Sequence, residues 1–240
     1  MAIPCYLAMS AAEYATCSAL PPRMGWMACH FSLQNDGLSN LPQQLPANSL
    51  LILDDSNPME NHNIDTILFQ LTNVIEEQKI DAVLLDFQRH SMRCEKELAA
   101  AICKALPCPV AATADYASES MPVFLPPAPL HQPLDVYLSK FTGQKLWLDA
   151  APIPTKICVT SAGSSYESHA SLSSNHLPHH AQQLQCHYGI DVQPERACFT
   201  LERTKEDFYA WLQAAESFGV VCAVGLYQEL NKYYNEKAAL

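Results

Sequence analysis

The sequence predicts an α/β fold, a closed (β/α)8 barrel that forms one domain over residues 1–240. Short segments of apolar and β-branched residues recur along the chain, and most are apolar at every position, as in strands buried on both faces of a parallel sheet. Helical segments separate several of these strands, which indicates right-handed parallel crossovers. The chain length suits a barrel, and the sequence contains no Gly-rich phosphate loop of the dinucleotide-binding type, so we prefer the barrel to an open doubly wound sheet.

Ten segments of the sequence are candidate strands. In chain order they are IPCYLAM, WMACHFS, SLLILDD, DAVLLDF, CPVAATA, PVFLP, KLWLDA, KICVTSA, RACFTLE and VVCAVGLY. A barrel of this class has eight strands, so we expect two segments to form an extra hairpin or not to be barrel strands. KICVTSA and the segment LQCHYGID flank a long polar stretch, and we expect them to form this hairpin.

Helices are predicted where apolar residues recur at intervals of three and four. One such stripe follows Asn63, and another lies between Thr204 and Gly219, where Thr204 and Asp207 have the spacing of a capping box and Gly219 ends the helix. Further helices are expected around residues 98–106 and 137–141. Prolines cluster in residues 40–46 and 125–129, where we expect extended connections to replace helices.

A polar stretch rich in Ser, His and Gln runs over residues 161–185. Such a stretch is either disordered or a lid over a site, and we expect residues 164–183 to be mobile or weakly packed beside the barrel mouth. Its histidines, and one that follows it, form neither the helical motif of zinc proteases nor a paired Cys-x-x-Cys motif; they are His169, His176, His179, His180 and His187. We therefore expect a solvated loop, with no metal and no cofactor.

Charge and cysteine content restrict the partners and the compartment. With 14 basic and 25 acidic side chains the formal charge is −11, which argues against nucleic acid and anionic membranes as partners. No apolar run approaches the roughly 20 residues that span a bilayer, and the first twenty residues lack the charged start of a secretory signal. The 10 cysteines sit singly in apolar segments, which indicates reduced core thiols in a cytoplasmic protein. The oligomeric state is not predicted.

The segment IDAVLLDFQR, residues 80–89, places polar side chains where a buried strand ends. Side chains alternate along a strand, so Leu84, Asp86 and Gln88 share one face. The opposite, apolar face, which includes Phe87, is expected to pack under a helix. Asp86 and Gln88 would then lie inside the barrel at its C-terminal mouth, where barrel enzymes carry their chemistry.

Within this segment, DAVLLDFQ resembles a degenerate form of the DGxDxDxE signature of the chitinase-type glycoside hydrolases of family eighteen. Asp81, Asp86 and Gln88 occupy its first, third-acid and glutamate positions, and the motif follows three predicted strands, as in that family. The resemblance implies that a glutamate at position 88 would protonate the glycosidic oxygen and that an aspartate at position 84 would position the substrate acetamide. Gln88 cannot act as this acid and Leu84 carries no charge, so the family mechanism cannot run unchanged here.

The candidate catalytic residues are Asp86 and Glu202, the latter as a substitute acid directly after the segment ACFTL. Candidate ligand-binding residues at other predicted strand ends are His30, Asp54, Gln88, Arg89, Tyr116, Asp149, Tyr227 and Gln228. Simpler structural roles stay open: Glu202 as a charge near a helix N-terminus, Asp54 and its neighbour Asp55 as turn residues, and Arg89 in a surface ion pair.

Three functions are compatible with this site. The first is a glycosidase-like barrel that binds a glycan or other small molecule without hydrolysing it. The second is an active barrel hydrolase that uses Asp86 with another carboxylate such as Glu202. The third is a protein interaction scaffold, because a barrel fold by itself does not specify function.

Overall fold

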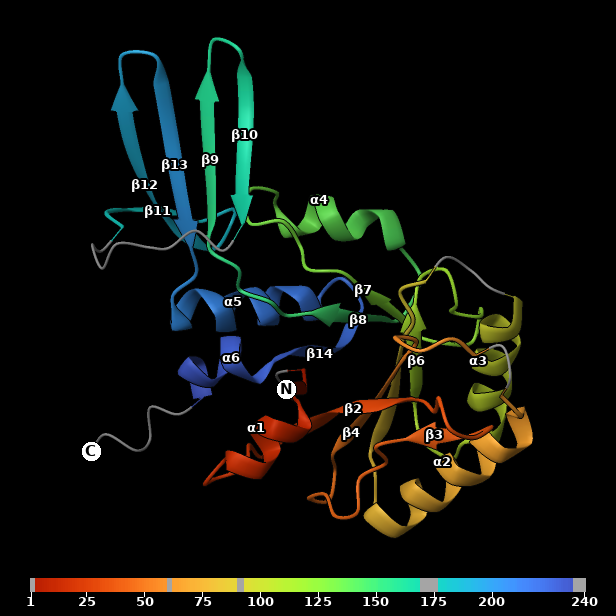
Figure 1. Cartoon of the computed structure of the whole chain (residues 1–240). Helices are drawn as coiled ribbons and strands as arrows, with labels where there is room; N and C mark the ends of the chain where they lie inside the picture. Colours follow the sequence, from red (N-terminus) through yellow and green to blue (C-terminus); the bar gives the residue numbers. More distant parts are fainter. Residues whose placement is uncertain (1–2, 60–61, 90–92, 169–176, 235–240) are drawn as a thin grey trace.

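The computed structural model describes residues 3–59, 62–89, 93–168 and 177–234 and shows the predicted barrel (Figure 1). Its eight parallel strands are β1 (Cys5–Met9), β2 (Met24–Phe31), β4 (Leu50–Asp54), β5 (Ala82–Asp86), β6 (Val110–Thr113), β7 (Val123–Leu125), β8 (Leu146–Asp149) and β14 (Val220–Leu226). Strand β1 pairs in parallel with both β2 and β14, and these two pairings close the sheet. A two-residue strand, β3 (Leu38–Ser39), adds to β2 in the antiparallel direction. The predicted fold class is confirmed.

Helices connect most of the barrel strands. They are α1 (Ala11–Thr16), α2 (Ile64–Gln78), α3 (Arg93–Ala105), α4 (Leu134–Leu138) with a 3-10 turn at Ser139–Phe141, α5 (Lys205–Glu216) and α6 (Tyr227–Tyr234). The Thr204–Asp207 capping box starts α5, as predicted, and Asn63, after which the first apolar stripe begins, caps α2. Residues 40–46 and 126–129 contain no helix, so both proline-rich segments are extended as predicted, and α4 follows the second of them.

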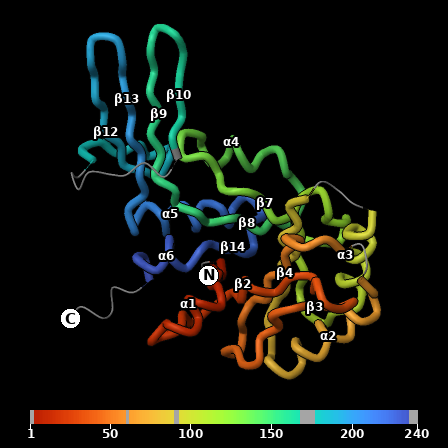
Figure 2. Tube along the Cα trace, in the orientation of Figure 1, coloured from red at the N-terminus to blue at the C-terminus, as the bar shows by residue number. Residues whose placement is uncertain are grey.

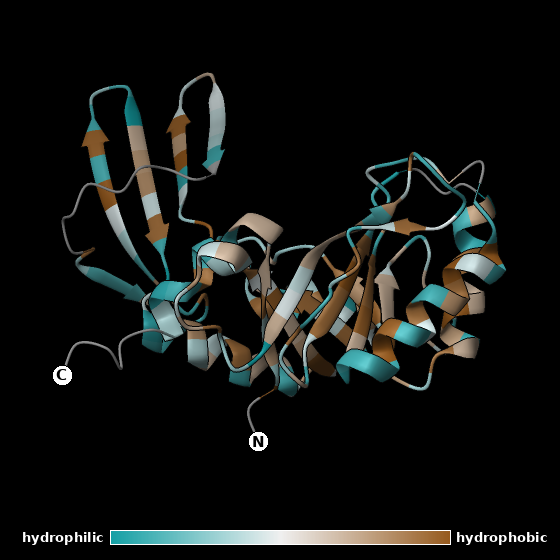
Figure 3. Ribbon diagram, turned by 60° about the horizontal axis from the view of Figure 1, so that its bottom comes forward, coloured by the Kyte–Doolittle hydropathy of each residue, from teal (hydrophilic) through white to brown (hydrophobic). Residues whose placement is uncertain are grey.

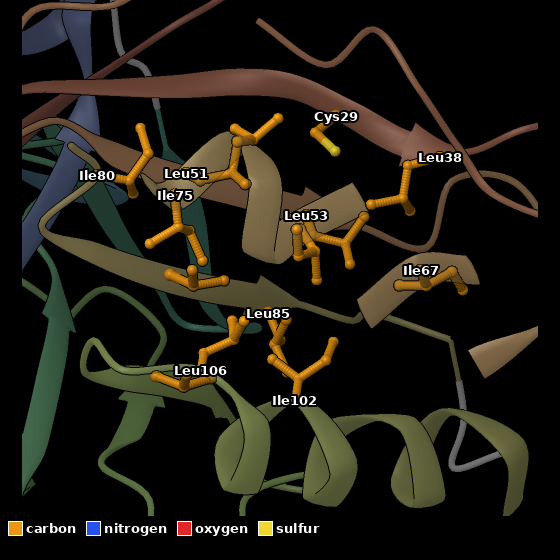
Figure 4. Packing of buried hydrophobic residues seen from close by; sticks show 14 of the residues in the cluster. Cys29, Leu38, Leu51, Leu53, Ile67, Ile75, Ile80, Leu85, Ile102 and Leu106 are labelled. Atoms are coloured by element: carbon orange, nitrogen blue, oxygen red, sulfur yellow. The ribbon is translucent and has the colours of Figure 1, made fainter. Parts of the chain in front are cut away.

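The core has the two layers expected for a barrel. Val83 and Leu85 of β5, with Phe87 just after the strand, belong to the cluster shared with α2 and α3, whereas Leu84 belongs to the cluster inside the barrel. Figure 4 shows Leu85 beside Ile102 of α3, with Leu51 and Leu53 facing α2. In Figure 3 the barrel strands are mostly hydrophobic, and the helices that cover them have a hydrophilic side. The alternation predicted for this strand is observed.

A second sheet is inserted between β8 and β14 and projects away from the barrel (Figures 1 and 2). Its antiparallel strands, in sheet order, are β10 (Gly163–Ser168), β9 (Thr155–Thr160), β13 (Arg196–Glu202), β12 (Cys186–Gln193) and β11 (His179–Ala181). KICVTSA and LQCHYGID thus lie outside the barrel as expected. They do not pair with each other in a hairpin, however, because β13 lies between them.

The inserted sheet corrects two predictions. RACFTLE is β13 of this sheet and is not a barrel strand, because its hydrogen bonds go to β9 and β12 in the antiparallel direction. The polar stretch contributes β10 and β11, so residues 164–168 and 179–181 form strands and not a loop, although residues 164–167 are exposed, which agrees with the expected weak packing. Backbone pairing across a sheet edge needs no apolar side chain, which explains how such a polar segment becomes strand. Residues 169–176 of the stretch lie outside the described residues.

The cysteines differ from the expectation at one pair. Cys158 of β9 and Cys198 of β13 are directly opposed in the sheet and form a disulfide. The remaining eight cysteines are free, but the prediction of core thiols holds only for the four that are buried, which are Cys5, Cys29, Cys186 and Cys222. Spacing along the chain could not reveal this pair, because the two residues are 40 positions apart and meet through strand pairing. Within the described residues, no helix is both long enough and apolar enough to cross a membrane.

Candidate functional site at the barrel mouth

A pocket of about 480 Å³ opens at the carboxyl ends of the barrel strands. Its deeper walls are apolar and come from several strands: Ala8, Ile52, Leu84, Phe124 and Val224. Polar side chains collect where the strands end: Asp86, Gln88, Arg89, Thr113, Asp115 and Asp149. Concave apolar pockets with a few convergent polar groups are the usual form of small-molecule sites.

Asp86 is the last residue of β5, and its carboxylate is held by the neighbouring amide. The Gln88 side chain donates from Nε2 to Asp86 Oδ1 over 2.5 Å. Burial raises the pKa of Asp86, the Gln88 hydrogen bond lowers it, and the charges of Asp54 and Asp55 raise it again. The net effect is a pKa above the ordinary aspartate value. Gln88 thus fixes the orientation of a carboxylate at the position where the resemblance places catalysis.

Asp149 ends β8 and lines the same pocket. Burial raises the pKa of Asp149 to about 7, with smaller contributions from the charges of Glu229 and Asp86, while a hydrogen bond from the Ala151 N–H opposes the change. That N–H donates to Asp149 Oδ1 over 3.0 Å. At neutral pH a large fraction of Asp149 therefore carries a proton, so this carboxyl group can donate as well as accept.

Asp55 holds the backbone of the turn that carries Gln88. Its side chain is buried and accepts the backbone N–H groups of Gln88 and Arg89 at 2.9 and 2.8 Å. These bonds hold the turn that follows β5. Asp55 is therefore a positioning residue for Gln88, a role more specific than the turn residue considered from the sequence.

Replacing Asp55 by alanine is expected to lower the free energy of unfolding by about 2–3 kcal/mol, because two buried N–H groups lose a charged acceptor. Urea unfolding followed by circular dichroism measures this change. Asp191, which is exposed on β12, provides the matched Asp→Ala control, and its loss is expected to cost little. An Asp55→Ala variant as stable as the control would contradict the role assigned to this side chain.

Two other predicted site residues form a pair beside the mouth. His30 Nδ1 and Asp54 Oδ2 lie 2.8 Å apart, and Asp54 Oδ1 accepts the N–H of Ser56. Neither His30 nor Asp54 lines the pocket. Arg89 does line it, and its guanidinium also donates to the Ser56 carbonyl. The His30–Asp54 pair therefore joins the ends of β2 and β4 beside the site.

Of the two aromatic residues predicted for the site, Tyr116 lines the pocket and Tyr227 does not. Tyr116 lines the pocket and packs edge-on against Phe87, with ring centroids 5.4 Å apart. Phe87 borders the pocket as well, but it is only 2% exposed and belongs to the helix-facing cluster. Tyr227 begins α6 with its hydroxyl 3.4 Å from the Cys17 thiol, and it does not line the mouth.

Glu202 and Gln228 lie outside the mouth. Glu202 ends β13 in the inserted sheet, and its Oε1 lies 3.6 Å from Lys232 Nζ. Gln228 is exposed in a separate groove with Lys232. Glu202 is thus not the second carboxylate of the pocket, because the strand that carries it is not part of the barrel. The structure brings together Asp86, Gln88, Arg89, Tyr116 and Asp149.

Sequence reasoning missed two acidic residues near this site. Asp115 lines the pocket, and its position directly after the segment CPVAATA was the available signal. Glu229 of α6 acts on Asp149 through its charge, which no local pattern indicates. Asp81, at the first position of the signature, lies just before β5 and accepts the Tyr6 hydroxyl over 2.6 Å. Since β5 runs from this end to the mouth, Asp81 is at the opposite end of the strand from Asp86.

Comparison with known proteins identifies the fold. No protein-family model matches the chain, and no curated protein matches its sequence. The solved spore cortex-lytic enzyme SleL of Bacillus cereus aligns with 97% of this chain and 74% of its own, at a TM-score of 0.57 and 7% identity. This chain has the same barrel fold. SleL of Bacillus megaterium QM B1551 aligns similarly, with 97% and 73% coverage, a TM-score of 0.53 and 10% identity. The fold expected from the degenerate chitinase-type signature is thereby confirmed, with the signature on the fourth parallel strand.

Proposed function

We propose that the barrel mouth binds a carbohydrate, or a small molecule of similar chemistry, without hydrolysing it. The observation that carries this proposal is the Gln88 amide, which donates to Asp86 Oδ1 at the position where the resemblance places a glutamic acid. An amide forms hydrogen bonds as donor and as acceptor, but its N–H protons are not acidic enough to be transferred to a leaving group.

The remainder of the pocket supports a sugar-like ligand. Hydroxyl groups need both donors and acceptors, and the mouth offers the Arg89 guanidinium, the Gln88 amide and the carboxyl groups of Asp86 and Asp149. Sugar rings also have apolar faces that pack on aromatic side chains, and Phe124 and other apolar residues form the deeper wall. The polar rim over an apolar floor therefore suits a ring that carries hydroxyl groups.

A second candidate is an active hydrolase, and Asp149 favours it. Burial raises the pKa of this carboxyl group to about 7, which is the range expected for a general acid at neutral pH. Asp86 would supply the second carboxylate. Asp149 thus takes the place that the sequence had suggested for Glu202.

Calorimetric titration with a chito-oligosaccharide, together with a fluorogenic glycoside assay, tests the proposal. We expect the wild type to bind the oligosaccharide and to show no turnover. Gln88→Ala removes the amide and is expected to weaken binding by about tenfold, since a polar contact contributes roughly 1–3 kcal/mol. Gln228→Ala, the same change at an exposed glutamine outside the mouth, is the matched control and is expected to bind as the wild type does.

The outcomes separate the candidate functions. Absence of binding by the wild type would overturn the proposal. Turnover by the wild type that is lost in Asp149→Asn and kept in Gln88→Ala would establish the hydrolase instead. Equal loss of binding in Gln88→Ala and Gln228→Ala would show that the ligand does not occupy the mouth.

A further inference from the structure

Three elements outside the barrel mouth bring two imidazoles and a carboxylate together. His180 of β11 and His187 of β12 are directly paired in the antiparallel sheet, and their ring centroids are 4.9 Å apart. Asp207 comes from the first turn of α5. One ligand-capable atom from each of these three side chains lies within 4.8 Å of the others. The inserted sheet and α5 therefore meet at a cluster of metal-ligating groups.

The contacts within the cluster are specific. His180 Nε2 lies 2.8 Å from Asp207 Oδ1, and His187 Nδ1 lies 2.8 Å from Asp207 Oδ2. The Asp207 side chain is only 8% exposed, whereas those of His180 and His187 are 43% and 28% exposed. A buried carboxylate thus faces two imidazoles that solvent, and a dissolved ion, can reach.

The start of α5 holds the carboxylate of Asp207 in place. Asp207 is part of the α5 capping box, in which the Thr204 N–H and hydroxyl bind Asp207 Oδ2 at 3.0 and 2.9 Å. The cap fixes the carboxylate independently of the histidines. Outer hydrogen bonds of this kind orient metal ligands in proteins.

We propose that His180, His187 and Asp207 form a divalent-metal site that binds zinc. Two imidazole nitrogens and one carboxylate oxygen are a common zinc ligand set, and three protein ligands leave the fourth tetrahedral position for water. The ion would take the place of the protons between the two ring nitrogens and the carboxylate: a neutral ring moves its proton to its other nitrogen, and a protonated ring releases one to solvent. Ligand atoms at normal zinc distances are roughly 3.3 Å apart. The two 2.8 Å contacts, which go to different oxygens of Asp207, therefore need to widen by about half an ångström, and any pair of ligand atoms near the 4.8 Å limit of the cluster needs to come closer.

A nearby positive charge affects the expected metal affinity of the site. Arg203 is buried, with its guanidinium 4.7 Å from the centroid of the Trp211 ring, and its charge interacts with Asp207. This cation opposes a second positive charge, so we expect moderate affinity. When bound, the ion would link β11 and β12 to the start of α5.

Metal titration of the full chain tests the site. After chelator treatment and dialysis, cobalt is added while the visible absorption bands of tetrahedral cobalt are recorded, and zinc is then added as a competitor. We expect saturation at one ion per chain and displacement by zinc. His180→Gln and His187→Gln are each expected to weaken binding at least tenfold, because each removes one ligand. Circular dichroism of both variants is used to check that they fold.

His179→Gln is the matched control. His179 precedes His180 on β11, so its side chain points to the opposite face of the strand, and its ring lies 5.1 Å from that of Tyr188. This variant is expected to bind cobalt and zinc as the wild type does. Absence of saturable binding by the wild type, or equal binding by the His180 and His187 variants, would overturn the proposal. Neither result depends on whether the barrel mouth binds a glycan.

Discussion

Gln88→Glu is expected to give the barrel a measurable glycosidase activity that the wild type lacks. The amide nitrogen that changes to oxygen lies 2.5 Å from Asp86 Oδ1, so the new carboxyl group would share a proton with Asp86. Two carboxylates at this separation cannot both ionise easily, which raises one pKa toward neutrality. A positioned general acid contributes roughly a hundredfold or more to rate. We expect a smaller gain, of about tenfold over the wild-type background, because Leu84 still lacks the charge that would support the substrate acetamide.

The double change Leu84→Asp with Gln88→Glu is expected to exceed the single change in activity per folded molecule. Leu84 is 1% exposed inside the barrel, so a carboxylate there costs several kcal/mol of stability unless it is paired. The folded fraction therefore has to be measured beside the fluorogenic glycoside assay. Gln228→Glu, outside the mouth, is the control and is expected to stay inactive. No gain in either mouth variant, together with no glycan binding by the wild type, would leave the strand-end motif as barrel architecture.

Asp149→Asn is expected to stabilise the protein by up to about 4 kcal/mol at pH 8. The folded protein holds the Asp149 proton with a pKa of about 7, against an ordinary value of 3.8. The folded state therefore binds this proton more tightly than the unfolded state does, and each tenfold difference in affinity is worth about 1.4 kcal/mol. This contribution is fully present below about pH 4 and is lost as the pH rises to about 7. Asparagine is neutral at every pH and keeps the Oδ1 acceptor for the Ala151 N–H.

Urea unfolding at several pH values between 5 and 8 measures this effect. The wild-type free energy of unfolding is expected to contain a component that falls over this range, and Asp149→Asn is expected to lose that component. Asp191→Asn, at an exposed position on β12, provides the control and is expected to follow the wild-type curve. A wild type and an Asp149→Asn variant with parallel pH curves would show that Asp149 titrates as an ordinary aspartate.

Several features of the site follow from local pattern. Alternation along a strand has a period of two, so the position of Asp86 at the mouth and of Phe87 toward the helices was predictable from the segment itself. Capping is equally local, and the Thr204–Asp207 box was visible in the sequence. Which other carboxyl groups line the pocket was not visible, because whether Glu202 or Asp149 lies at the mouth depends on which strands enter the barrel.

The sequence by itself determined a parallel α/β fold, since strands buried on both faces must be apolar throughout and helices between them require parallel crossovers. Chain length and the lack of a Gly-rich phosphate loop then favoured the barrel over an open sheet. Only the tertiary structure decided that RACFTLE is part of the inserted sheet and not of the barrel, because the residues of a strand do not specify which strands will hydrogen-bond to it. It also decided the elevated pKa of Asp149, which is set by burial under distant segments. The cluster of His180, His187 and Asp207 exists only once the inserted sheet meets α5. Pairing, burial and charge proximity are properties of contacts between segments, and a single segment does not encode them.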